Sequence, residues 1–190
     1  MRKQIVIFVV FSVVGTVGLS GCSNKDKQPK TISIETFSDM NNDNVSQSII
    51  SGSFAIRNVG TGKNIKPYNS DKYDGNDIIL YPHNEWKCLT WQFNHIDGIA
   101  YQLENLYTQK TFEPKSHLVS GVTLWQQPLN NNSPQWEFIK QQDGVYAIRL
   151  KDTELYLTIS SNKTDAAIIL LPYGNTSSQQ WKLIEQYPNV

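Results

Sequence analysis

Residues 134–138 read Pro-Gln-Trp-Glu-Phe, and residues 179–183 read Gln-Gln-Trp-Lys-Leu. Trp136 and Trp181, at the centre of these stretches, lie 45 residues apart, and Trp91 lies another 45 residues upstream. A large hydrophobic residue follows each tryptophan two positions later, namely Phe93, Phe138 and Leu183. A spacing that recurs in three copies indicates an internal repeat.

Further hydrophobic positions recur in the same three units. They are Phe54, Tyr101 and Tyr146, then Ile65, Phe112 and Leu157, then Ile79, Leu124 and Ile169. The first two sets step by 47 and 45 residues, and the third set steps by 45 and 45. The first unit therefore has two extra residues between Ile65 and Ile78, in a segment rich in Gly, Pro and Asn that we interpret as a loop.

Each unit has the pattern of four short strands, with alternating hydrophobic residues as in Phe54-x-Ile56 and Trp136-x-Phe138. Asp97-Gly98 and Asp143-Gly144 join consecutive units, and Asp-Gly between strands predicts a type I′ turn with two positive φ angles. Three blades are too few for a β-propeller. Three units that share one core instead predict an all-β chain, a β-trefoil with three repeats of about 45 residues.

The tryptophan motifs also resemble a known family. Gln135-Trp136-x-Phe138 and Gln179-Gln180-Trp181-x-Leu183 are similar to the Gln-x-Trp repeats of ricin B-type lectin domains, whereas Leu89-Thr90 precede Trp91 in the first unit. The resemblance covers residues 51–187 and implies a non-catalytic, carbohydrate-binding module. It also implies that Trp91, Trp136 and Trp181 are structural core residues.

In this family a sugar site combines a carboxylate after the first strand, an aromatic ring on the third strand and amides before the repeated tryptophan. The second unit fits this pattern best. The resemblance assigns sugar binding to Glu113 as the acid, Trp125 as the aromatic ring, and Gln127, Asn132 and Gln135 as the amides; Gln126 is expected on the same edge.

The other two units depart from the pattern. Lys66 and Leu80 occupy the acidic and aromatic positions of the first unit, and Thr158 and Leu170 occupy those of the third. The alternative for the second unit is that Trp125 packs on the surface and Glu113 is a solvated acid.

The N-terminus has the pattern of an export signal. Arg2 and Lys3 precede an uncharged run from Ile5 to Leu19, which is short for a membrane span. Residues 19–22, Leu-Ser-Gly-Cys, resemble the lipobox of bacterial lipoproteins. The resemblance implies a signal peptide over residues 1–21, cleavage before Cys22, and lipidation of Cys22 with diacylglycerol chains such as palmitate. A plain cleaved signal peptide is the alternative.

Residues 22–50 are predicted to be the lipidated cysteine and a flexible tether with an end-to-end distance of about 30 Å. Ile32, Ile34 and Phe37 could instead add a strand to the domain, which is assigned to residues 51–190. We therefore expect a lipid-anchored protein of the cell envelope, on the outer membrane in a two-membrane bacterium. Cys88 is the one cysteine left, so no intramolecular disulfide is expected.

Composition and motifs exclude several other classes. The chain has 17 basic and 17 acidic residues, and cleavage of the signal peptide would remove two of the basic ones, Arg2 and Lys3. The remaining chain has no excess of positive charge of the kind that binds nucleic acid. The three histidines lack ligand partners at metal-site spacing, and no catalytic or phosphate-loop motif is present. We therefore predict no enzyme activity, no cofactor and no metal.

Two further functions remain open. The lipid-anchored trefoil shows a weaker resemblance to the A-type binding subunit of cytolethal distending toxins, whose partner is a catalytic subunit. Such a role needs a docking patch, for which Tyr68, Tyr73 and Trp86 are the candidates. A trefoil that binds protein through its loops is the other possibility.

The lipobox yields the first testable prediction. Cys22→Ala removes the thiol that would carry the lipid, so the protein should leave the membrane fraction or stall before cleavage. Detergent phase partitioning measures this. A variant that still enters the detergent phase as the unmodified chain does would contradict the anchor.

Overall fold

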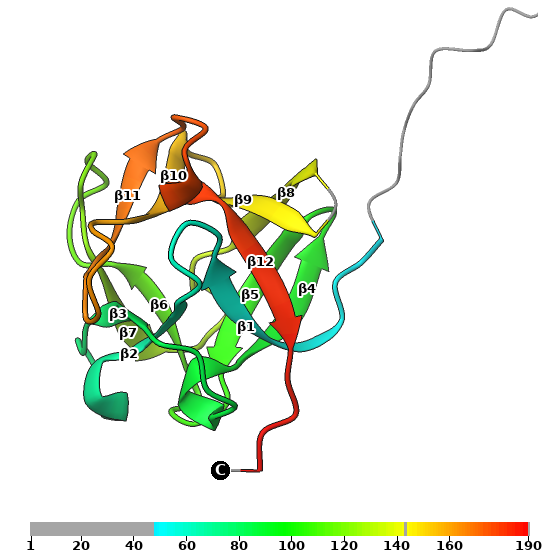
Figure 1. Cartoon of the computed structure of the whole chain (residues 1–190), viewed down its shortest axis with the longest axis vertical. Helices are drawn as coiled ribbons and strands as arrows, with labels where there is room; N and C mark the ends of the chain where they lie inside the picture. Colours follow the sequence, from blue (N-terminus) through cyan, green and yellow to red (C-terminus); the bar gives the residue numbers. More distant parts are fainter. Residues whose placement is uncertain (1–47, 143, 190) are drawn as a thin grey trace, which may run out of the picture. The chain divides into compact units, whose positions relative to one another are not determined.

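The computed structural model describes residues 48–142 and 144–189 (Figure 1). The predicted signal peptide, Cys22, most of the predicted tether and Asp143 lie outside these ranges. The described part contains twelve β-strands and three short 3-10 helices, and none of its helices is long and apolar enough to cross a membrane.

The strands follow one another in three groups of four. They are β1 (Gly52–Asn58), β2 (Asn64–Pro67), β3 (Ile78–Tyr81), β4 (Trp91–Asp97), β5 (Ala100–Asn105), β6 (Lys110–Pro114), β7 (Leu124–Pro128), β8 (Trp136–Gln142), β9 (Val145–Leu150), β10 (Leu155–Ile159), β11 (Ile168–Pro172) and β12 (Trp181–Glu185). The 3-10 helices are η1 (Tyr68–Ser70), η2 (Lys87–Leu89) and η3 (Ser177–Gln179).

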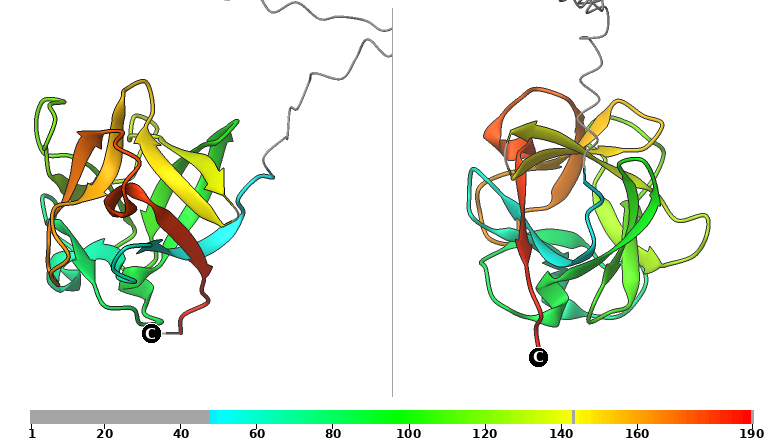
Figure 2. Two further views of the ribbon diagram at one scale, coloured as in Figure 1. Left: turned by 45° about the horizontal axis from the view of Figure 1, so that its top comes forward. Right: turned by 90° about the vertical axis from the view of Figure 1, so that its right-hand side faces the viewer.

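Six strands form a closed barrel. Each strand is antiparallel to the next in the order β1, β4, β5, β8, β9, β12, and β12 pairs with β1 to close the ring. The other strands form the hairpins β2–β3, β6–β7 and β10–β11, which gather at one end of the barrel (Figures 1 and 2). A six-stranded barrel capped by three hairpins is a β-trefoil, which confirms the predicted fold class.

Backbone hydrogen bonds join the three hairpins into a triangle. Leu80 N donates to Ala166 O at 2.9 Å, Leu170 N donates to Val122 O at 3.0 Å, and Gln126 N donates to Asn76 O at 2.7 Å. Return bonds run from Asp165 N to Leu80 O, from Gly121 N to Leu170 O and from Gly75 N to Gln126 O, so each hairpin donates to both neighbours and accepts from both. The donors Leu80, Gln126 and Leu170 are therefore equivalent positions in the three units.

This equivalence corrects the predicted register of the third strand. The buried residues Ile78, Leu124 and Ile168 are equivalent and step by 46 and 44 residues, so the alignment of Ile79 and Ile169 with Leu124 was wrong by one residue. The sequence alignment gave the first unit two extra residues relative to both other units. In the structure, the first hairpin is one residue longer than the second and two residues longer than the third. A slip of one residue would turn the buried face of a strand outward, which fixes the observed register.

The corrected register changes which residues are compared between units. The equivalents of Trp125 are Ile79 and Ile169, and the equivalent of Leu80 and Leu170 is Gln126. Gln126 is completely buried and therefore does not lie on the outer edge where it was expected. Its Nε2 donates to the carbonyl oxygens of Asp71 at 2.7 Å and Tyr73 at 2.6 Å, which fastens the long loop of the first unit to the second.

The three repeated tryptophans lie in the core, where the repeat predicts them. The side chains of Trp91, Trp136 and Trp181 have no exposed surface. Trp91 Nε1 donates to Ile65 O at 3.2 Å, and Trp181 Nε1 donates to Leu157 O at 3.0 Å. Trp136 Nε1 is buried without a hydrogen-bond partner among the described residues, so the second unit breaks the symmetry here too.

The turn between β4 and β5 also differs from the prediction. Asp97 pairs with Ala100, so the two-residue loop is Gly98-Ile99 and not Asp97-Gly98. Gly98 has a φ of +47°, whereas Ile99 has no positive φ, so the two positive angles of a type I′ turn are not met. A bulge between His95 and Asp97 shifts the turn along the chain.

Truncation of a core tryptophan should be severe. Trp136→Ala should lower the free energy of unfolding by about 3–5 kcal/mol, as for other buried aromatic residues. Trp136→Phe should cost less than Trp181→Phe, because only Trp181 donates a hydrogen bond, which contributes about 0.5–1.5 kcal/mol. Denaturant unfolding of the variants measures both effects. Equal losses for the two Phe variants would contradict the asymmetry.

Candidate sugar-binding site

The predicted acid and aromatic ring meet on the outer face of the β6–β7 hairpin. Glu113 and Trp125 are direct partners in the ladder, and Trp125 Nε1 donates to Glu113 Oε1 at 3.3 Å. Both residues are half-buried, whereas the neighbouring positions Phe112 and Gln126 point into the core. Strand alternation therefore presents the pair to solvent.

A glycine of the first unit lies beside the indole ring of Trp125. A Cβ atom on Gly75 would lie 3.6 Å from Cε3 and 3.8 Å from Cζ3 of Trp125. Gly75 has a φ of +83°, a conformation that favours glycine. The turn thus requires a residue without a side chain, and the loop of the first unit packs against this edge of the ring.

The predicted amides are distributed along the same end of the unit. Gln127 is half-buried and lies two residues from Trp125, on the same face of β7. Asn132 is exposed in the β7–β8 loop. Gln135 is half-buried, and its Oε1 accepts a hydrogen bond from Lys151 Nζ at 2.9 Å.

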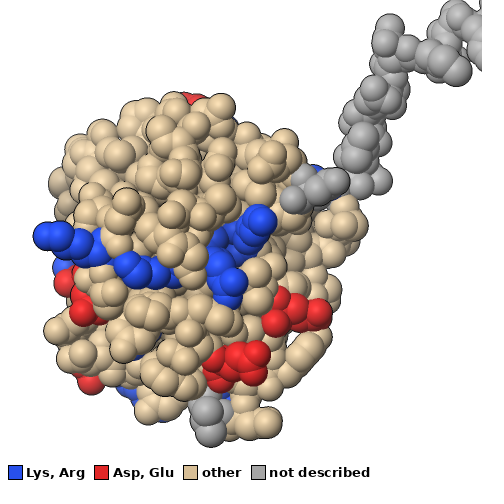
Figure 3. Space-filling model, in the orientation of Figure 1, with Lys and Arg blue, Asp and Glu red and all other residues tan. Residues whose placement is uncertain are grey.

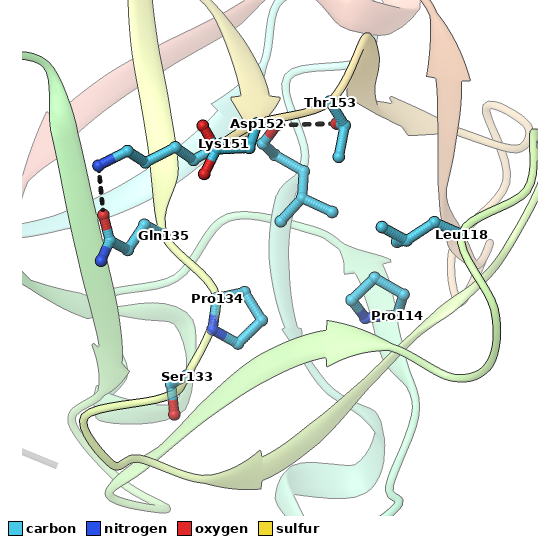
Figure 4. Close-up of a pocket in the computed structure, with 9 residues that line it drawn as sticks. Pro114, Leu118, Ser133, Pro134, Gln135, Lys151, Asp152 and Thr153 are labelled. Atoms are coloured by element: carbon cyan, nitrogen blue, oxygen red, sulfur yellow. Dashed lines mark hydrogen bonds between the residues drawn. The ribbon is translucent and has the colours of Figure 1, made fainter.

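A pocket of about 350 Å³ opens at the junction of the second and third units (Figure 4). Its lining residues are Pro114, Leu118, Ser133, Pro134, Gln135, Leu150, Lys151, Asp152 and Thr153. Gln135 belongs to both this pocket and the predicted site, whereas neither Glu113 nor Trp125 lines the pocket. The structure therefore joins the acid to the ring and places one predicted amide in a separate hollow.

The sequence analysis missed the polar residues of this pocket, Lys151, Asp152 and Thr153. The sequence does contain an indication of this pocket, because Leu150 replaces an asparagine that the other two units have as Asn58 and Asn105. Those asparagines donate from Nδ2 to Ser177 O and Cys88 O, both at 2.9 Å, and so tie each unit to its neighbour. Leu150 cannot make this bond, and Asp152 in the loop beside it has a φ of +61°.

Residues 87–171 match the family model described as ricin-type beta-trefoil lectin domain-like. This part of the chain is therefore similar to a ricin-type β-trefoil lectin domain. The matched residues extend from η2 to β11 and include all five residues of the predicted sugar site. A comparison with curated protein sequences found no match.

Solved structures share the β-trefoil fold of this chain. The designed threefold-symmetric protein ThreeFoil is 20% identical with a TM-score of 0.67, over 71% of this chain and 99% of that one. The Rhizoctonia solani agglutinin is 18% identical with a TM-score of 0.66, over 74% and 99%. The Macrolepiota procera ricin B-like lectin, solved with lactose, is 20% identical with a TM-score of 0.64, over 73% and 99%.

The three units of the trefoil differ at the predicted site. The partners equivalent to Glu113 and Trp125 are Lys66 and Ile79 in the first unit, and Thr158 and Ile169 in the third. Among the described residues, an acid beside a solvent-facing aromatic ring occurs at these positions in the second unit alone.

The glutamine of the Gln-x-Trp motif has a structural role in the third unit. Gln179 Nε2 donates to Thr158 Oγ1 at 3.0 Å and to Pro172 O at 2.9 Å, and the residue is almost completely buried. Pro134 takes its place in the second unit. Thr158 is the equivalent of Glu113. Glu113 therefore accepts a hydrogen bond from Trp125, whereas Thr158 accepts one from a glutamine.

The chemistry of the site is that of hydrogen bonding and stacking. A carboxylate offers about four acceptor positions, of which the Trp125 N–H uses one. Among the described residues no group of His, Cys, Asp and Glu could hold a metal ion, and His83, His95 and His117 are all exposed. Burial lowers the pKa of His83 from its ordinary value, and the nearby charge of Arg57 lowers it further.

Proposed function

We propose that this trefoil binds a carbohydrate on the outer face of the β6–β7 hairpin, without catalysing a reaction. The observation that carries the proposal is the contact between Trp125 and Glu113, which sets a carboxylate beside a half-exposed indole ring. The indole ring offers an apolar face to the C–H groups of a pyranose. The carboxylate accepts charge-assisted hydrogen bonds from its hydroxyl groups.

The fold supports the same class of ligand. The Macrolepiota procera lectin, which shares this fold, was solved with lactose, so galactose-terminated glycans are the first candidates. Gln127 and Gln135 would supply further donors and acceptors at the rim. A shallow site of this kind binds weakly, because each sugar hydroxyl exchanges a hydrogen bond with water for one with protein.

Attachment to the cell envelope through Cys22 would compensate for weak binding. A surface that carries many lipid-anchored copies engages a multivalent glycan with an effective concentration far above that of a free protein. A tether over residues 22–50 would let neighbouring domains reach the same ligand. We therefore propose a lectin-like surface lipoprotein.

Glycan binding should depend on Trp125 and Glu113, whereas folding should not. Trp125→Ala and Glu113→Gln should each lower glycan binding at least about tenfold, because each removes a contact of about 1.5–3 kcal/mol. Ile169→Ala changes the equivalent position of the third unit and should leave binding unchanged. A glycan array followed by titration of the best ligand measures the affinity, and thermal melts verify folding.

The outcome also separates the proposal from its alternatives. Wild-type affinity in Trp125→Ala would place the sugar site elsewhere. A folded protein that binds no glycan on the array would contradict a lectin and favour a protein-binding trefoil, such as a subunit that delivers a catalytic partner.

A further inference from the structure

A second pocket, of about 290 Å³, lies at the junction of the first and second units. Its lining residues are Ser70, Trp86, Lys87 and Cys88 of the first unit and Tyr107 of the second. The side chains of Trp86 and Tyr107 are 40% and 42% exposed, so two aromatic rings in the wall of the pocket face solvent. A volume near 300 Å³ is at the small end for ligand pockets and suits one sugar ring.

Three lysines surround this pocket. Lys66 Nζ donates to Ser70 Oγ at 3.1 Å, Lys72 Nζ lies 4.2 Å from the centre of the Tyr107 ring, and Lys87 lines the pocket directly. Lys66 is only 5% exposed, and its second neighbour is the ring of Tyr81 at 4.5 Å. The ammonium of Lys66 is thus held inside the domain by a hydroxyl group and a ring, both neutral.

These ammonium groups form no ion pair with the described residues, and the ammonium of Lys87 donates to the backbone oxygen of Asn189 at 3.1 Å. Among the described residues no carboxylate oxygen lies within 4.0 Å of the ammonium groups of Lys66, Lys72 or Lys87. None of the five lining residues is acidic. Asp71 follows Ser70 and Glu85 precedes Trp86 in the sequence, and neither forms an ion pair with these lysines. Burial of a charge is costly unless it is paired, so the pocket favours an anion.

The equivalent junctions have different chemistry. The position of Tyr107 is taken by Asp152 in the pocket of Figure 4, which therefore contains both an acid and Lys151. Gly60 takes this position at the junction of the third and first units, where a Cβ atom would lie 2.9 Å from Ser177 Oγ. Of the three junctions, the one at Tyr107 combines exposed aromatic rings with unpaired positive charge.

We propose that this pocket binds an acidic sugar, whose carboxylate is held by Lys66, Lys72 and Lys87 and whose ring packs against Trp86 and Tyr107. The position of Lys66 is that of Glu113 in the second unit, so the charge that the first unit offers to a ligand is reversed. The site would operate beside the proposed one at Glu113 and Trp125 and does not depend on it. The chain would thereby recognise a glycan that carries both neutral and acidic sugars.

The test compares two matched disaccharides on the full chain. Digalacturonate and digalactose share their ring stereochemistry and differ in a carboxylate against a hydroxymethyl group, and inorganic phosphate serves as an anion without a ring. The indole N–H signals of Trp86 and Trp125 in an NMR titration report on the two sites separately. Digalacturonate should shift the Trp86 signal with a Kd about tenfold below that of digalactose, as one charge-assisted contact provides.

Lysine variants distinguish binding in this pocket from general electrostatic attraction to the positively charged surface. Lys66→Met and Lys72→Gln should each remove most of the preference for digalacturonate; Lys72 is exposed, so its change leaves folding intact. Lys182→Gln is the control. Lys182 faces Arg57 across β12 and β1, where Figure 3 shows positive side chains on the surface, and its loss should leave binding unchanged.

Four results would overturn the proposal. They are equal affinity for the two disaccharides at Trp86, equal loss in Lys182→Gln and Lys72→Gln, binding of phosphate as tight as that of digalacturonate, and an unchanged Trp86 signal. A shift of Trp125 without a shift of Trp86 would overturn this inference and leave the site of the second unit standing.

Discussion

The ring of backbone hydrogen bonds between the three hairpins is the contact on which this trefoil depends. Each hairpin has one apolar face, and burial of that face requires the other two units. The donors Leu80, Gln126 and Leu170 are all completely buried, so their N–H groups would remain unpaired if any unit were missing. Because each pair of hairpins exchanges backbone hydrogen bonds in both directions, the triangle fixes the register of every hairpin against its neighbours.

Function arises where the three units depart from this symmetry. The core columns are nearly the same in each unit, whereas the outer partners are Lys66 with Ile79, Glu113 with Trp125, and Thr158 with Ile169. The junctions differ in the same way, since pockets open at the two junctions of the second unit and Gly60 lies close to Ser177 at the third. A shared scaffold thus carries three different outer faces, and one of these faces and one junction combine an aromatic ring with charge.

Much of the fold could be predicted because core residues are constrained in both type and spacing. The tryptophan column and the strand pairs around it allow no insertion without loss of the barrel register, so their 45-residue step persists. The hairpin loops have no such constraint, and their different lengths displaced the third-strand alignment by one residue. The choice of Glu113 and Trp125 followed from the family resemblance. The Leu150 junction, the inward side chain of Gln126 and the lysines around Tyr107 depend on contacts between units, which an alignment of single units does not contain.

Gln126 makes the order of the units matter. The side chains of Leu80 and Leu170, its equivalents, need only apolar packing, whereas the side chain of Gln126 needs the carbonyl groups of Asp71 and Tyr73 in the longest of the three hairpin loops. A symmetric protein built from three copies of the third unit would place three leucines on the axis of the cap. One built from three copies of the second would place three glutamines there, beside loops too short to accept their hydrogen bonds. A glutamine at this position therefore requires an elongated loop in the unit beside it.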